Sequence, residues 1–139
     1  MRRTATRFTV TALFLVASCG CGGSQIKTVP VSGVVALDGQ PLAEATVTFQ
    51  PVDGQANSPG SHGKTDAKGQ FQLRVTVTKQ TGAVPGKHRV RISAAPATTS
   101  DDAKLQVQDP VPARYRDGSE TFEVPTQGTD KADFRMTSK

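Results

Sequence analysis

Apolar and polar residues alternate with a period of two from residue 29 onward, which is typical of strands with one buried face. No stretch shows a sustained period of 3.6. The residues expected to point inward are Val29, Val31, Val35 and Leu37; Ala45, Val47 and Phe49; Phe71, Leu73, Val75 and Val77; His88, Val90 and Ile92; Phe122, Val124, Phe134 and Met136. The pattern predicts an all-β domain over 29–138, with about seven short strands in a two-sheet, Greek-key β-sandwich.

Turn-forming residues separate these runs. Asp38-Gly39, Asp66-Ala67-Lys68-Gly69 and Val84-Pro85-Gly86 predict tight turns, because they combine Asp, Gly and Pro at suitable spacing. Residues 53–61 and 94–112 predict two longer loops. Within the second loop, Leu105 and Val107 are compatible with a short strand. With 35% apolar residues and no Trp, the chain supplies one thin core.

The first eighteen residues have a different pattern. Arg2, Arg3 and Arg7 precede an apolar run, 8–17, which only Thr9 and Thr11 interrupt. A spanning helix needs about 20 apolar residues, so this run is too short for a lasting membrane anchor. Its length and flanks predict a cleaved signal peptide at 1–18.

The end of that run is Val16-Ala17-Ser18-Cys19. It resembles the lipobox of bacterial lipoprotein precursors. The resemblance implies that a peptidase recognises Val16, Ala17 and Ser18, and that Cys19 becomes lipidated and is the first residue after cleavage. Cys21 fits the motif poorly. The alternative is an ordinary secretory leader with a chance cysteine.

The segment after the lipobox, residues 19–28, is rich in Gly and predicts a lipidated, flexible tether. Its short length keeps the domain close to the bilayer. The resemblance to lipoproteins implies a lipid-anchored protein of the cell envelope, and Gly20 in place of Asp favours the outer membrane. Whether the domain faces the periplasm or the surface stays open, as does the fate of the Cys21 thiol.

The net charge of +5 overstates the basic character of the mature chain. Three of the 17 basic residues lie in the leader, whereas all 12 acidic residues follow it. The mature chain therefore carries 14 basic and 12 acidic residues, a net charge of +2. Such a mild excess argues against nucleic acid as a partner.

Three segments of the domain resemble carboxypeptidase regulatory-like (transthyretin-like, or prealbumin-like) domains. They are 31–49, with Leu37-Asp38-Gly39-Gln40-Pro41-Leu42; 65–71, with Thr65-Asp66-Ala67-Lys68-Gly69; and 84–90, with Val84-Pro85-Gly86-Lys87. The third motif usually has an aromatic residue where this chain has His88. The resemblance implies a prealbumin-like sandwich and says little about activity, because such domains are mostly accessory modules.

Candidate chemistry is sparse. His62 and His88 are the only histidines, too few for a zinc site, so we expect no metal and no cofactor. The run 115–119 (Tyr-Arg-Asp-Gly-Ser) resembles the Tyr-Arg-Gly-Ser tail of transthyretin-related hydrolases, but Asp117 interrupts it and the accompanying histidines are missing. No nucleophile motif is present. We therefore expect no catalytic residues and a protein that is not an enzyme.

A basic stripe is the remaining candidate surface. Lys87, Arg89 and Arg91 alternate with the inward residues of one strand, and Arg74 could join them. They are either a solvated strand face or a contact for an acidic polymer or lipid head groups. The sequence predicts a non-enzymatic, lipid-anchored envelope module with a structural or protein-interaction role; the alternative is a module that binds an envelope polysaccharide or another polymer. The oligomeric state stays open.

Overall fold

The computed structural model describes residues 26–52, 58–94 and 109–138. The predicted signal peptide, the predicted lipobox (Val16, Ala17, Ser18 and Cys19) and the predicted short strand at Leu105 and Val107 lie outside these residues. The elements are β1 (Ser32–Leu37), β2 (Gln40–Pro41), β3 (Thr46–Pro51), β4 (Ser61–Lys64), β5 (Gln70–Gln72), β6 (Arg74–Val75), β7 (Gly86–Ser93), α1 (Ala113–Arg116), β8 (Glu120–Val124) and β9 (Phe134–Met136). The prediction of an all-β domain with two sheets is confirmed. In the described ranges no helix could span a membrane.

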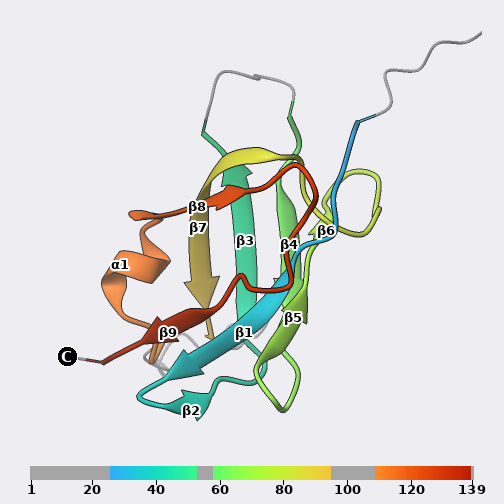
Figure 1. Cartoon of the computed structure of the whole chain (residues 1–139). Coiled ribbons are helices and arrows are strands. Elements are labelled where there is room, and N and C mark those ends of the chain that lie inside the picture. The colour runs from blue at the N-terminus through green and yellow to red at the C-terminus, as the bar shows by residue number, and fades with distance from the viewer. Residues whose placement is uncertain (1–25, 53–57, 95–108, 139) are drawn as a thin grey trace, which may run out of the picture.

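The larger sheet is antiparallel throughout, in the order β6-β4-β3-β7-β8 (Figure 1). The smaller sheet is built around β1, which pairs antiparallel with β2 and β5 and parallel with β9. Strands β1 and β9, close to the two ends of the described chain, therefore lie side by side. The Asp133 carboxylate reinforces this pairing, since its Oδ1 accepts the Val34 N–H at 3.0 Å.

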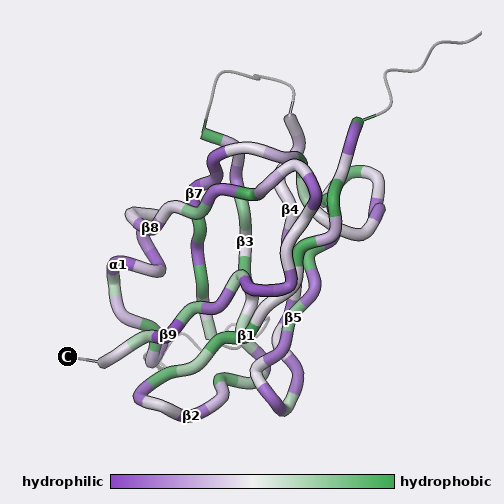
Figure 2. The backbone as a smooth tube through the Cα atoms, viewed as in Figure 1, coloured by the Kyte–Doolittle hydropathy of each residue, from purple (hydrophilic) through white to green (hydrophobic). Residues whose placement is uncertain are grey.

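The core lies between the two sheets and contains most of the inward residues that the alternation predicts, although Leu37 and Phe122 are only partly buried. Ala83, Val111, Tyr115 and Ala132 also belong to it, and the alternation did not predict them. Strand β7 follows the pattern over its whole length: His88, Val90 and Ile92 are buried and the residues between them are exposed. Hydrophobic and hydrophilic positions accordingly alternate along β7 in Figure 2. Phe49 is central, with ring centroids 5.7 Å from Phe122 and 6.1 Å from Phe134.

The predicted strand 71–77 is divided between the sheets, so this prediction was wrong in part. Strand β5 pairs with β1, whereas β6 pairs with β4 in the other sheet, and the chain crosses between them at Leu73. Leu73 is buried, its N–H bonding to the Val31 carbonyl at 2.9 Å. Val77, expected inward, is 70% exposed in a turn. Period-two alternation does not show where a strand changes sheets.

Two further differences from the predictions concern short elements. Ser61, placed in a loop, begins β4 and is buried, and the pair Gln40–Pro41 forms β2. The described residues thus contain nine strands rather than about seven. Helix α1 has four residues, too few to show helical periodicity, and Tyr115 is its buried residue.

The Asp66–Gly69 turn forms as predicted. The Asp66 Oδ1 accepts the N–H groups of Lys68 at 2.8 Å and Gln70 at 2.9 Å. Gly69 has φ +70°, and a Cβ there would collide with the Val35 carbonyl oxygen. This motif therefore needs Asp and Gly for its backbone geometry alone.

The strand directions define two ends of the domain. The stem end contains the N-terminal stem (26–30), Val52, and the segments 58–60, 76–86 and 125–129. The opposite end contains the turn 38–45, the turn 65–69, Ala94, Asp109 and the C-terminal residues 137–138. In Figure 1 the stem leaves at the upper right and the C-terminus lies at the lower left.

Candidate functional site

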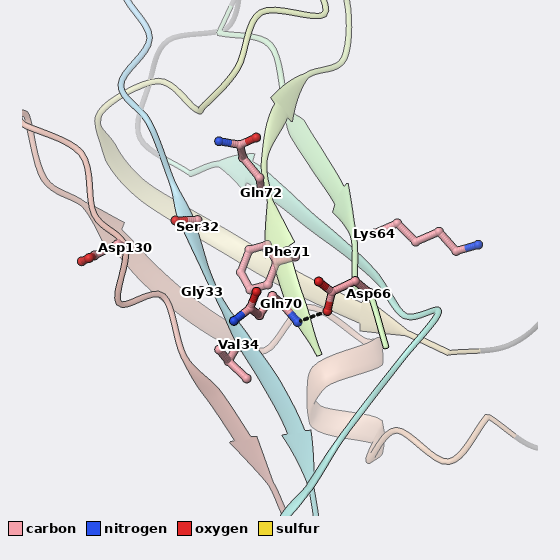
Figure 3. Close-up of a pocket in the computed structure, with 9 residues that line it drawn as sticks. All are labelled: Ser32, Gly33, Val34, Lys64, Asp66, Gln70, Phe71, Gln72 and Asp130. Carbon is pink, nitrogen blue, oxygen red and sulfur yellow. Dashed lines mark hydrogen bonds between the residues drawn. The ribbon is translucent and has the colours of Figure 1, made fainter. Parts of the chain in front are cut away.

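The outer face of the smaller sheet is hollowed along β1. Two depressions of about 550 Å³ and about 450 Å³ share Val34 in their linings. Figure 3 shows the residues that line the larger of these two. Since Val31, Gly33 and Val35 point into the core, the alternate residues Ser32, Val34 and Ala36 point outward. These side chains are small, so the surface above β1 is lower than the surface of β5 on one side and of the segment 130–136 on the other. We call this hollow the β1 groove.

Polar side chains stand on both sides of the β1 groove. Gln70 and Gln72 of β5 line one side, and Asp130, Asp133 and Arg135 line the other. In Figure 3 the Gln70 amide leans toward β1, whereas Lys64 extends away from it. The floor is therefore weakly apolar and the walls offer both hydrogen-bond donors and acceptors.

The groove walls are not equally free to bind. Asp66 Oδ1 already accepts hydrogen bonds from two N–H groups of its own turn, and Asp133 Oδ1 accepts the Val34 N–H. No hydrogen bond joins the Gln70 or Gln72 side-chain amides to other described residues. These two amides and the Arg135 guanidinium are thus the groups best placed to bind an extended polar chain lying along β1.

Metal binding has no support in residues 26–52, 58–94 and 109–138. They contain no group of three or more His, Cys, Asp and Glu side chains that could hold a metal ion. The two histidines occupy different environments. His62 is partly exposed, and its Nδ1 lies 3.2 Å from the Thr76 hydroxyl. His88 is instead buried in the core.

The predicted basic stripe lies on the outer face of the larger sheet. Lys87, Arg89 and Arg91 are exposed on β7. Arg74 is on the same face, on the edge strand β6, with β3 and β4 between it and β7. The cross-strand register aligns Arg91, Thr48, His62 and Arg74 in one row. Three strand spacings separate Arg74 from Arg91, about 14 Å.

Part of the basic stripe is engaged within the fold. The Arg91 Nε donates to the Arg116 carbonyl at 3.0 Å, at the end of α1. The stems of Arg89 and Arg91 pack against Gly118, where φ is +81° and a Cβ would lie 2.8 Å from the Arg89 Cδ. Lys87 lies opposite Glu123 in the register of β7 and β8, so a carboxylate stands on the neighbouring strand. These contacts reduce the cationic surface that a ligand could use.

The segment 115–119, which contains the Arg116 carbonyl that Arg91 contacts, is held by its own hydrogen bonds. Asp117 Oδ1 accepts the Ser119 N–H at 2.8 Å and the Ser119 hydroxyl at 2.6 Å. These hydrogen bonds, with a smaller contribution from the charge of Arg91, lower the pKa of Asp117. Tyr115 is buried, and the Arg114 guanidinium lies 4.7 Å from its ring centroid. The segment forms a turn that covers part of β7.

The sequence did not point to the β1 groove. Ser32, Val34 and Ala36 carry no distinctive chemistry, and the groove exists only because segments distant in sequence, β5 and 130–135, rise beside them. The one available signal was the smallness of the outward residues in 32–36.

Comparisons with known proteins give no family: no family model, no curated protein and no solved structure matches the chain. The class that the fold defines is therefore a coarse one, an all-β domain of two antiparallel-rich sheets packed over one core.

Proposed function

We propose that this protein is a non-enzymatic, lipid-anchored module of the bacterial cell envelope, with its folded domain acting as a structural or protein-interaction unit. The observation that carries the proposal is the position of the first backbone pairing in the described residues. Val29 is paired with Ala83, each N–H donating to the other's carbonyl at 2.9 Å. Only seven residues lie between Cys19 and Lys27. They span at most about 28 Å, so lipid on Cys19 would hold the domain beside the bilayer.

The resemblance to carboxypeptidase regulatory-like domains supports an accessory role. In the described chain, the motif residues serve turns and strand pairing: Asp66 and Gly69 form a turn, and Gly86 begins β7 with φ +125°. Under this proposal the two sheets belong to a Greek-key, prealbumin-like sandwich preceded by a cleaved signal peptide. Interaction then occurs through loops or an edge strand, in the outer-membrane compartment.

The β1 groove favours a second candidate function, binding of an envelope polysaccharide or another polymer. Its floor is open along β1 and its walls carry the Gln70 and Gln72 amides. Amide side chains hydrogen-bond hydroxyl groups through both donors and acceptors. The two functions differ in whether the groove itself is needed.

Lipid anchoring is tested first, on the whole protein expressed in a bacterial envelope. We expect mass spectrometry to find the mature N-terminus at an acylated Cys19, and Cys19→Ala to abolish acylation and leave the precursor uncleaved by the lipoprotein peptidase. Cys21→Ala is the matched control and should be processed normally. Correctly processed, detergent-free Cys19→Ala protein would contradict the anchor.

The interaction role is then tested by crosslinking and mass spectrometry on intact cells. Reproducible crosslinks to one envelope protein, kept by a Gln70→Ala/Gln72→Ala variant, would support the interaction module. Saturable, salt-resistant binding to isolated envelope polysaccharide that this variant loses would support the polymer-binding alternative.

A further inference from the structure

The two ends of the domain differ in charge. In the stem-end segments 26–30, 58–60, 76–86 and 125–129, the charged residues are Lys27 and Lys79, and there is no carboxylate. Two described carboxylates border these segments: Asp130 follows residue 129 and lines a hollow with Pro30, and Glu123 lies opposite Lys87 in the register of β7 and β8. The opposite end carries four carboxylates, Asp38, Glu44, Asp66 and Asp109, and one lysine, Lys68. The domain is therefore electrically polarised along its strands.

The two ends also differ in exposed apolar side chains. Within the described chain, the large hydrophobic residues exposed to solvent are Val77, at 70%, and Val52, at 42%. Val77 lies in the turn after β6, and Val52 follows the last residue of β3, so both are at the stem end. A valine at the tip of a solvated turn contributes little to the core, since its apolar surface stays in water.

The turn that displays Val77 is well ordered. The Val75 N–H donates to the Gln80 carbonyl at 2.8 Å, and the Lys79 N–H donates to the Val75 carbonyl at 2.9 Å. The Thr76 N–H donates to the Gly60 carbonyl at 2.9 Å, which ties the turn to the start of β4. Lys79 adopts φ +60°, an uncommon conformation for a residue with a side chain. The turn thus holds an apolar side chain and a lysine together at a fixed place.

We infer that the stem end rests on the membrane that holds the anchor, with Val77 in the anionic headgroup layer and Lys27 and Lys79 paired with lipid phosphates. This inference rests on the proposed lipid anchor, and it adds an orientation and a lipid-contacting surface. Charge complementarity supports it, because lysines beside an anionic surface are attracted, and the four carboxylates Asp38, Glu44, Asp66 and Asp109 lie at the far end. An apolar side chain flanked by cations is the usual composition of an interfacial contact.

The tether gives the same orientation. The stem enters the domain beside Gly82 and Ala83, where a Cβ on Gly82 would collide with the Val29 carbonyl oxygen. The stem end is therefore the part of the domain from which the chain runs to Cys19. A tether spanning at most about 28 Å cannot carry the opposite end to the bilayer as easily as the stem end.

The test uses the full, acylated chain in vesicles of phosphatidylcholine with about 30% phosphatidylglycerol. In a Cys21→Ser background, Val77→Cys is labelled with an environment-sensitive fluorophore, and brominated lipids serve as quenchers. The matched control is Lys68→Cys, in the turn 65–69 at the opposite end. We expect the label at position 77 to be quenched at least about twofold more than the label at position 68, because an interfacial side chain lies about 5–10 Å deep.

A second pair of variants tests the charge contribution. Lys79→Glu should reduce quenching at position 77 markedly, whereas Lys68→Glu should leave it unchanged. Equal quenching at positions 77 and 68 in acylated protein would overturn the orientation while leaving the anchor intact. Absence of acyl chains on Cys19, seen in the mass of the same preparation, would overturn the anchor and the orientation with it.

Discussion

The imidazole of His88 packs against the ring of Phe49, with 5.8 Å between centroids and 44° between the ring planes. Only 1% of His88 is exposed, and its Nδ1 lies 2.9 Å from the Gly86 carbonyl oxygen. Because that oxygen can only accept, Nδ1 carries the proton and Nε2 presents a lone pair. Nε2 is buried without a hydrogen-bond partner. The neutral imidazole thus occupies an aromatic position in the core.

Burial lowers the pKa of His88 below its ordinary 6.5, against an opposing effect of the Gly86 hydrogen bond. The folded state therefore binds a proton less readily than the unfolded state does. The free energy of unfolding should be highest above the unfolded pKa and should fall as the pH drops through 6.5 toward the folded pKa. Urea unfolding at about pH 8 and about pH 5.5 measures the difference.

The variant His88→Phe isolates this effect, since Phe keeps the ring in the core and has no ionisable group. We expect a flatter pH profile than that of the wild type, and stability at about pH 8 within about 1 kcal/mol of it. Identical profiles for the wild type and His88→Phe would show that His88 does not control the acid sensitivity.

Gly33 and Ala132 give a second prediction. A Cβ on Gly33 would overlap the backbone carbonyl of Ala132. The Ala132 N–H also donates a hydrogen bond to the Ser32 carbonyl of β1, which fixes this residue beside the strand. Backbone cannot move aside cheaply, so Gly33→Ala should destabilise the domain by about 2 kcal/mol. Gly39→Asn is the control: Gly39 has φ +80° and open space around it, and Asn tolerates that conformation. Its effect should stay within about 0.5 kcal/mol by urea unfolding.

Thr65 joins two segments at the opposite end of the domain. Its buried hydroxyl accepts the Ala45 N–H at 2.8 Å, while its own N–H donates to the Ala45 carbonyl at 2.8 Å. Thr65→Val keeps the shape but leaves the Ala45 N–H without an acceptor, which should cost about 1–3 kcal/mol. Thr65→Ser retains the hydroxyl and should lose much less. Equal losses in calorimetry would assign the effect to packing rather than to this hydrogen bond.

Where a strand lies in one sheet and is covered on one face, its burial could be predicted from the sequence. This holds for His88, Val90 and Ile92 in β7 and for Val47 and Phe49 in β3. Local signals also predicted the turn at Asp66, because the side chain bonds to its own turn. In these cases the residues that determine the local structure lie within a few positions of the residues whose burial or turn was predicted.

What could not be predicted depends on distant partners. The groove at Val34 requires β5 and the segment 130–135, and the engagement of Arg91 requires the Arg116 carbonyl from α1. The change of sheet at Leu73 depends on β1 competing with β4 as a pairing partner. None of these leaves a trace in the local pattern of apolar residues.

The division of the predicted strand 71–77 has a direct thermodynamic test. Val75 and Val77 look equivalent in the sequence, but Val75 is fully buried and Val77 is 70% exposed. Val75→Thr places a hydroxyl in the core and should lower the free energy of unfolding by about 1–3 kcal/mol. Val77→Thr alters a solvated side chain and should change it by less than about 0.5 kcal/mol. Urea titration of the two variants in parallel gives the comparison, and equal losses would mean that the strand continues past Val75. A small effect of Val77→Thr on folding would also show that the Val77 side chain does not stabilise the core, which leaves its apolar surface available for the membrane contact inferred above.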